Sequence, residues 1–242
     1  MNAEARLRVL VVDDEPDILE VIRITLRTRG GFEVEVCGSG DETVEAARRF
    51  APDLIVLDVM MPGLDGPATL RALRDEPDTA SIPIAFMTAK TTKHDMASYL
   101  DLGVAAVIAK PFDQRTLANE LEQIAGQASS GASAEDDPEL AELLDAYEKA
   151  LPERIREIRE LWAGVESGLD ADAGRSFYRR VHNLAGTAGT FGHPALSDAA
   201  RRLEQQIGGG RAAGVEPTPT LRRTVGALID ALDAAARSGR TR

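Results

Sequence analysis

Five side chains suited to phosphoryl or metal chemistry each follow an apolar run in the first half of the sequence. They are Asp13, Asp14, Asp58, Thr88 and Lys110. In an open sheet of parallel strands, the carboxyl ends of the strands lie along one edge, and ligands bind there. We therefore expect three carboxylates, one hydroxyl and one ammonium group to converge from four strands.

The three carboxylates indicate a divalent cation. Carboxylates that lie close together repel one another unless a cation joins them, and oxygen ligands without His or Cys favour Mg²⁺. Mg²⁺ held by a few carboxylates usually serves phosphoryl chemistry, in which Thr88 and Lys110 would hold phosphoryl oxygens. A single Asp at a strand end is commonly a helix N-cap, but polar groups at four strand ends favour a site.

The second half of the sequence carries a histidine on a stretch with helical spacing. From Phe177 to Phe191 the apolar residues step by four, three, four and three positions, which predicts one helix face turned to a core. His182 lies one residue, about 100°, off that stripe, so we expect it to be at least partly exposed. Small residues such as Gly186 and Gly189 follow it. Both a flat surface for a partner and close helix packing fit this spacing.

The elements that must position the first group of residues form a sheet. Apolar runs alternate with amphipathic stretches, which predicts a five-stranded parallel α/β fold. The second run alternates apolar and acidic residues from Phe32 to Val36, as an edge strand does, and the sheet order 2-1-3-4-5 places strand 2 at an edge. Because a proline follows the last run directly, the Lys110–Pro111 bond is a candidate cis peptide. The runs cover residues 7–12, 32–37, 54–57, 82–88 and 104–109.

The second half has a different organisation. Residues 127–137 are small, polar and acidic with no apolar period, which predicts a linker between a domain at 1–126 and a domain at 138–242. Beyond the linker we find no strand-like run, and short connections between helical stretches predict an antiparallel all-α bundle. The helical stretches cover about 138–150, 152–168, 172–191, 194–207 and 217–238.

The composition of the chain limits the classes of partner and the cellular compartment that we expect. The chain has 28 Lys and Arg against 40 Asp and Glu, a net charge of −12, so we expect no nucleic-acid partner. Its one cysteine cannot form an internal disulfide or a Cys-rich zinc site, which fits a reduced, cytoplasmic setting. No segment approaches the roughly 18 apolar residues that a spanning helix needs, so we expect no membrane partner.

Four motifs occur in order along the first domain and resemble those of a response-regulator receiver domain, a flavodoxin-like fold. The resemblance covers residues 6–125. It implies that Asp58 accepts a phosphoryl group as a carboxylate nucleophile. The motifs are Val11-Val12-Asp13-Asp14-Glu15-Pro16, Leu57-Asp58-Val59-Met60-Met61-Pro62-Gly63-Leu64-Asp65-Gly66, Met87-Thr88-Ala89 and Lys110-Pro111-Phe112.

The resemblance also assigns roles to the neighbours of the phosphoacceptor. Mg²⁺ would be held by Asp13, Asp14 and Asp58 together with the backbone carbonyl of Met60. Thr88 would move towards the phosphoryl group and Lys110 would pair with it. One position departs from the common pattern. Many receivers carry an aromatic residue three positions before the lysine, which rotates inward with the threonine, and Val107 stands there in this chain.

The bundle carries a motif of its own, His182-Asn183-Leu184-Ala185-Gly186-Thr187-Ala188, followed by Phe191-Gly192. This stretch resembles the histidine-containing phosphotransfer (HPt) domain, a helical bundle with one phosphorylatable histidine. The resemblance extends loosely over residues 138–238 and implies that His182 carries a phosphoryl group. At the position of Ala185 the family often has a lysine that helps to hold this group.

Together the two resemblances predict a two-component phosphorelay protein that uses Asp58, His182 and Mg²⁺. A sensor histidine kinase, another receiver domain or both would be its partners. We recognise no ATP-binding kinase domain, so we expect a phosphotransfer protein rather than an enzyme. The alternative is a phosphorylation-gated interaction module with little or no histidine phosphotransfer. A phosphatase of the haloacid-dehalogenase type is disfavoured, because Met60 stands where its second Asp would be. The oligomeric state, and exchange between Asp58 and His182 within one chain, stay open.

Overall fold

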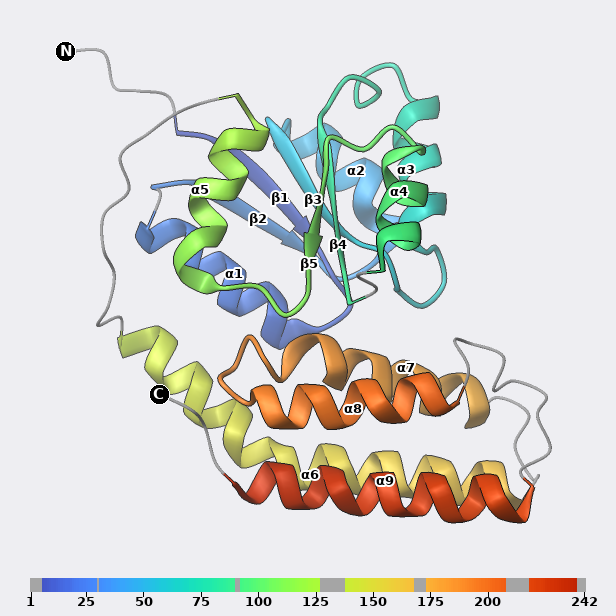
Figure 1. Cartoon of the computed structure of the whole chain (residues 1–242). Helices are drawn as coiled ribbons and strands as arrows, with labels where there is room; N and C mark the ends of the chain where they lie inside the picture. Colours follow the sequence, from blue (N-terminus) through green and yellow to red (C-terminus); the bar gives the residue numbers. More distant parts are fainter. Residues whose placement is uncertain are drawn as a thin grey trace. The chain divides into compact units, whose positions relative to one another are not determined.

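A computed structural model describes residues 6–29, 31–89, 92–126, 138–167, 173–207 and 218–238 (Figure 1). The chain divides into two compact units, Met1–Leu143 and Leu144–Arg242. The predicted linker at 127–137 lies outside the described residues. Within the described residues, no helix combines the length and apolarity that crossing a membrane requires.

The first unit contains the predicted five-stranded parallel sheet, in the order β2-β1-β3-β4-β5. Its central strands β3 and β4 are buried along their whole length, whereas β2 is largely accessible at one edge. The predicted sheet order and the edge position of the second strand are confirmed. The strands are β1 (Arg8–Val12), β2 (Glu33–Cys37), β3 (Leu54–Asp58), β4 (Ile84–Thr88) and β5 (Ala106–Ala109).

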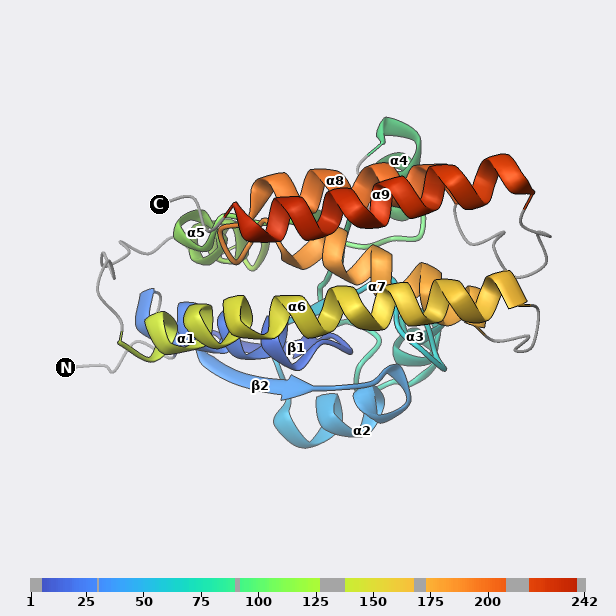
Figure 2. The ribbon, with the colours of Figure 1, turned by 90° about the horizontal axis from the view of Figure 1, so that it is seen from below.

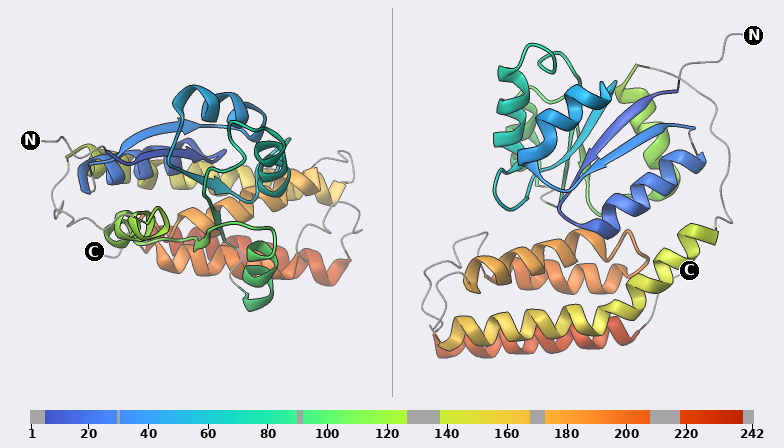
Figure 3. Two further views of the ribbon diagram at one scale, coloured as in Figure 1. Left: turned by 90° about the horizontal axis from the view of Figure 1, so that it is seen from above. Right: turned by 180° about the vertical axis from the view of Figure 1, so that it is seen from behind.

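Helices cover both faces of this sheet (Figure 3). Because side chains alternate along a strand, Leu10 and Val12 face α2 and α3, where they share a core with Phe50 and Leu73. The helices α1 and α5 pack together on the opposite face (Figure 1). The helices of this unit are α1 (Pro16–Arg29), α2 (Gly40–Phe50), α3 (Gly66–Asp75), α4 (Lys93–Leu100) and α5 (Gln114–Ile124).

The second unit consists of helices in the described residues (Figure 2). They are α6 (Pro138–Ser167), α7 (Ala173–Thr187), α8 (Pro194–Gln206) and α9 (Pro219–Arg237). The predicted break between 150 and 152 is wrong, because α6 continues through Pro152. A proline inside a helix costs about 3 kcal/mol. Here one buried stripe runs past it, through Tyr147, Leu151, Ile155, Ile158 and Trp162, and packing of that stripe outweighs the cost.

Aromatic contacts in the bundle core hold α7 in place. The Tyr147 ring of α6 stacks on Phe191 with 3.9 Å between the ring centroids, and its hydroxyl lies 3.0 Å from the Thr187 hydroxyl. Further along α6, the ring centroid of Trp162 lies 5.2 Å from that of Phe177. These contacts bury the apolar stripe of α7 that its spacing predicts, and they set the direction in which the rest of α7 faces.

Candidate functional site

Three carboxylates meet at the carboxyl end of the sheet. Asp13, Asp14 and Asp58 each bring one oxygen to within 4.8 Å of the other two. The pairing of neighbouring strands continues beyond Asp58, because the Val59 N–H donates to the Met87 carbonyl at 3.1 Å. The sheet therefore places the three acids, as the positions of the strand ends predict.

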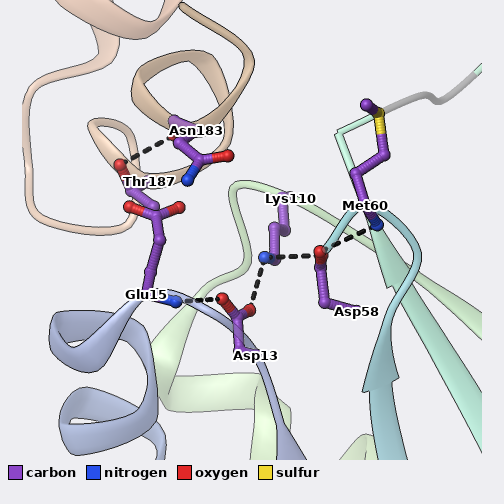
Figure 4. A network of polar contacts seen from close by, with 7 residues as sticks. All are labelled: Asp13, Glu15, Asp58, Met60, Lys110, Asn183 and Thr187. Carbon is purple, nitrogen blue, oxygen red and sulfur yellow. Dashed lines mark hydrogen bonds and ion pairs between the residues drawn. The ribbon is translucent and has the colours of Figure 1, made fainter. Parts of the chain in front are cut away.

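The Lys110 ammonium group bridges two of these acids (Figure 4). Its Nζ lies 2.6 Å from Asp13 Oδ2 and 2.8 Å from Asp58 Oδ1, and all three side chains are buried. Burial lowers the pKa of Lys110, but the charges of Asp13 and Asp58 outweigh burial, so this pKa lies well above its usual value. The ammonium group therefore stays charged inside the cluster. The Lys110–Pro111 peptide is cis, as predicted.

The second oxygen of Asp58 is held by the backbone. The Met60 N–H donates to Asp58 Oδ2 at 2.8 Å (Figure 4), so both oxygens of this carboxylate have partners. A close approach of α3 shapes the same loop: a Cβ at Gly66 would lie 2.5 Å from the Asp58 carbonyl oxygen and 2.7 Å from Val59 Cα. Only glycine fits there. The role of the Met60 carbonyl as a metal ligand stays a prediction.

Thr88 completes the group at the end of β4, where its neighbour Met87 pairs with Asp58 across the sheet. It is 1% exposed. Its side chain hydrogen-bonds Tyr99 of α4, a residue that our sequence reasoning missed. The sequence gives only one related signal, the absence of an aromatic residue at position 107. That signal does not identify Tyr99.

The donor set fits Mg²⁺. Three carboxylates face one ammonium group, so the cluster keeps a net negative charge, and its ligand atoms are all oxygens. Asp14 is half-buried while Asp13 and Asp58 are buried, so one side of the cluster stays open to solvent. A divalent cation held there would relieve the repulsion that one lysine leaves.

His182 lies on α7, and its Nδ1 is 2.7 Å from Glu204 Oε1 of α8. The Tyr178 hydroxyl donates to the same oxygen at 2.9 Å. His182 is 4% exposed, so our expectation of a partly exposed imidazole is wrong. Glu204 and the Tyr178 ring lie against the imidazole. Glu204 is 22 positions away on another helix, and no local pattern connects it to His182.

The contact with Glu204 decides which nitrogen of His182 is nucleophilic. An ionised carboxylate only accepts hydrogen bonds. Opposite an ionised Glu204, Nδ1 carries the proton, which leaves the lone pair of the neutral ring on Nε2. The same carboxylate holds the ring in one orientation, since it is itself held by Tyr178.

Comparisons with known proteins divide the chain into two regions, as the structure does. A family model for the response regulator receiver domain matches residues 9–122, and one for the Hpt domain matches residues 142–236. The DNA-binding response regulator MtrA of Mycolicibacterium smegmatis is 39% identical over 112 residues, which are 46% of this chain and 47% of MtrA. The response regulator Rre1 of Synechocystis is 33% identical over 153 residues, 62% of this chain and 64% of Rre1.

Solved structures match the first half of the chain. The chemotaxis protein CheY4 of Vibrio cholerae is 30% identical with a TM-score of 0.47, and the match covers 50% of this chain and 99% of that one. The receiver domain of a sensor histidine kinase from Pseudomonas aeruginosa, solved with a magnesium ion in its active site cleft, is 31% identical with a TM-score of 0.46 and covers 51% and 100%. The chain spans about half the length of the curated relatives it first matches.

Proposed function

We propose that this chain, which carries a response regulator receiver domain followed by an Hpt domain, is a phosphorelay protein that accepts a phosphoryl group on Asp58 and carries one on His182. This pair of domains indicates two-component phosphorelay signalling. The main support for phosphoryl acceptance by Asp58 is the Lys110 ammonium group, which is buried between Asp58 and Asp13 beside a third carboxylate. Its partners are a sensor histidine kinase, another receiver domain or both.

The receiver step is a nucleophilic substitution at phosphorus. An oxygen of the Asp58 carboxylate attacks the phosphorus of a phosphohistidine donor, the P–N bond breaks, and its electron pair returns to the donor imidazole. The product is an acyl phosphate on Asp58. Lys110 already contacts Oδ1 of this carboxylate, so its charge can follow the phosphoryl oxygens as they arrive. The Met60 N–H keeps the carboxylate in one orientation, and Thr88 donates to a phosphoryl oxygen.

The acidic cluster supplies the metal site for this step. Asp13, Asp14 and Asp58, with the Met60 carbonyl, would hold Mg²⁺, which neutralises charge on the phosphoryl oxygens when it is bound. Without a cation, an incoming phosphoryl group meets three carboxylates and only one ammonium group. We therefore expect phosphorylation to depend on Mg²⁺.

The Hpt step runs through Nε2 of His182. Its lone pair attacks the phosphorus of an acyl phosphate, the P–O bond to the carboxylate breaks, and the carboxylate leaves with the electron pair. The imidazole then bears a positive charge, because Nδ1 keeps its proton. Glu204 lies 2.7 Å from that nitrogen and stabilises the charged ring.

Labelling with radioactive acetyl phosphate and Mg²⁺ tests the proposal. The chain, Asp58→Asn and His182→Gln are labelled, and the label is located after digestion. His94→Gln, a change at an exposed histidine of α4, is the matched control. We expect label on Asp58 that disappears without Mg²⁺. Absence of label from the unmodified chain, with Mg²⁺ binding established separately, refutes phosphoryl acceptance.

The same experiment separates the routes through His182. Label on both residues of the unmodified chain, with none on His182 in Asp58→Asn, shows exchange between the two sites, and mixing Asp58→Asn with His182→Gln tests exchange between chains. Label on Asp58 alone directs the search to a partner receiver, offered in its phosphorylated form. Loss of phosphate passage to every partner tested, with partner binding intact in His182→Gln, favours the interaction module instead.

A further inference from the structure

Tyr178 of α7 contacts the surroundings of His182 in two ways. It lies one helical turn before His182, and the centroids of the two rings are 6.0 Å apart with 21° between the ring planes. Its hydroxyl reaches across to α8 and donates to Glu204 Oε1 at 2.9 Å. The tyrosine is 4% exposed. One buried side chain therefore lies against the imidazole and also holds the carboxylate that contacts it.

Glu204 Oε1 receives both contacts. His182 Nδ1 lies 2.7 Å from this oxygen, and the Tyr178 hydroxyl lies 2.9 Å from it. For a neutral imidazole, a short contact between Nδ1 and a carboxyl oxygen is compatible with two proton positions. Either Nδ1–H donates to an ionised carboxylate, or a protonated carboxyl group donates to the lone pair of Nδ1. Only the first arrangement leaves the lone pair of the ring on Nε2.

The Tyr178 hydroxyl favours the first arrangement. A phenol has one proton to donate, and here this proton goes to Glu204 Oε1. Hydrogen bonds to an ionised acceptor are roughly twice as strong as those between neutral groups. An oxygen that already carries a proton for Nδ1 would be a neutral and poorer acceptor for the phenol. The second donor therefore stabilises the charged carboxylate, and opposite that carboxylate the proton of the imidazole lies on Nδ1.

The ring of Tyr178 restrains the imidazole as well. A half-turn of the imidazole about its bond to Cβ would place a carbon opposite Glu204 Oε1, so the hydrogen bond depends on one orientation of the ring. The tyrosine ring is stacked beside the imidazole, and the Glu204 side chain, which is 14% exposed, lies at Nδ1. Both restraints come from α7 and α8. The bundle itself therefore orients His182 before a phosphoryl donor arrives.

We propose that Tyr178 is a positioning residue for phosphotransfer: its hydroxyl keeps Glu204 ionised, and this carboxylate holds the proton of His182 on Nδ1. Nε2 then keeps its lone pair, and the nitrogen that attacks the phosphorus is selected in advance. A neutral ring with its proton on Nε2 has no lone pair there with which to attack. The inference rests on the proposed phosphoryl transfer to His182, and it adds the residue that selects the reactive nitrogen.

Nitrogen NMR of the full chain, labelled with ¹⁵N-histidine, measures the position of this proton. A ring nitrogen that carries a proton and one that carries a lone pair have well-separated chemical shifts. The chain has three histidines, so His182→Gln assigns the signals of interest. At a pH at which the ring is neutral, we expect the proton on Nδ1 and the lone pair on Nε2 in the unmodified chain. Tyr178→Phe keeps the ring but removes the hydroxyl, so both signals should move towards the values of mixed tautomers.

Tyr147→Phe is the matched control, because it removes another buried tyrosine hydroxyl of the bundle, which lies 3.0 Å from the Thr187 hydroxyl. We expect it to leave the nitrogen signals of His182 and the rate of transfer unchanged. Single-turnover transfer to His182, with a saturating amount of the phosphorylated receiver that loads it, should be about two- to tenfold slower in Tyr178→Phe, the range expected for the loss of one hydrogen bond. The receiver concentration at half-saturation should stay the same, since the variant loses only a buried hydroxyl.

The two measurements separate the tautomer from the transfer. A mixture of tautomers in the unmodified chain, or unchanged nitrogen signals in Tyr178→Phe, overturns the role of the hydroxyl whatever the rate of transfer. A similar movement of the signals in Tyr147→Phe also overturns it, because any loosening of the bundle would then have this effect. Altered signals with an unchanged rate overturn the role in transfer. Absence of transfer to the unmodified chain from every phosphorylated receiver tested refutes the proposed function of His182 and the role in transfer with it, whereas the nitrogen signals report on the tautomer separately.

Discussion

Replacing Lys110 by methionine tests whether one buried ammonium group holds the acidic cluster together. Methionine has a similar length but no charge, so Asp13 and Asp58 lose a common partner that lies 2.6 and 2.8 Å away. Three carboxylates within 4.8 Å of one another then face no cation from the protein. Asp13 and Asp58 are 0% and 4% exposed, so their charges stay buried when the lysine is removed.

The expected loss is large. At 2.8 Å and an effective dielectric constant of about 20, one pair contributes about 6 kcal/mol of Coulomb attraction, before the cost of burying the charges is subtracted. Removing one partner of a buried ion pair typically costs about 3–5 kcal/mol, because the other charge stays buried. We expect Lys110→Met to lower the free energy of unfolding of the first unit by that amount without Mg²⁺, and Mg²⁺ to recover part of it.

Urea unfolding followed by two signals measures this loss in the full chain. Far-ultraviolet circular dichroism reports on both units, whereas fluorescence of Trp162, the only tryptophan, reports on the bundle. We expect Lys110→Met to shift the dichroism transition of the first unit and to leave the Trp162 transition in place. Lys149→Met is the matched control, since this exposed lysine of α6 pairs with Asp145, and we expect no measurable shift.

Two results would refute the reasoning. One is an unchanged dichroism transition in Lys110→Met without Mg²⁺, which would mean that the lysine does not offset the carboxylates. The other concerns pH. Because the pKa of Lys110 is raised, its stabilisation is complete below the usual lysine pKa and is lost only above it. The difference between Lys110→Met and the unmodified chain should stay constant from about pH 7 to 9, and a difference that fades across this range contradicts the assignment.

Three further changes have defined outcomes. Glu204→Gln should slow phosphotransfer through His182 by about 10–100-fold, because a hydrogen bond to a charged group contributes about 1.5–3 kcal/mol. Transfer from a phosphorylated receiver at the same rate to this variant and to the unmodified chain would contradict the argument that Glu204 holds the proton on Nδ1. The phenol of Tyr99 should ionise above its ordinary pKa, so its contribution to stability is complete below the ordinary pKa and is lost as the pH rises through the raised one; an absorbance titration compared with Tyr99→Phe checks this, and ionisation at or below the ordinary value refutes it. Pro152→Ala should raise the Trp162 unfolding midpoint, since a helix-interior proline costs about 3 kcal/mol, and a lowered midpoint would mean that the proline is favourable in α6.

The sequence alone was enough to predict that the residues of the acidic cluster lie close together. Asp13, Asp58 and Lys110 lie far apart in the chain, yet each directly follows an apolar run. In a parallel sheet all such positions fall at one edge, so the type and order of the strands determine the convergence without any knowledge of side-chain packing. The edge position of β2 could be predicted in another way, from its alternating apolar and acidic residues, which suit an edge strand.

Local sequence patterns were insufficient wherever the packing of one helix or strand against another determines the structure. Pro152 predicts a helix end, but the buried stripe of α6 on both sides of it carries the helix through. His182 contacts Glu204, and Thr88 is a neighbour of Tyr99. Each contact joins two elements whose relative rotation depends on the whole core, and no spacing within one helix or strand encodes that rotation. The sequence therefore determined which groups can do chemistry and where they gather. Only the tertiary structure decided which neighbours orient them, because those neighbours are chosen by the packing of one element against another.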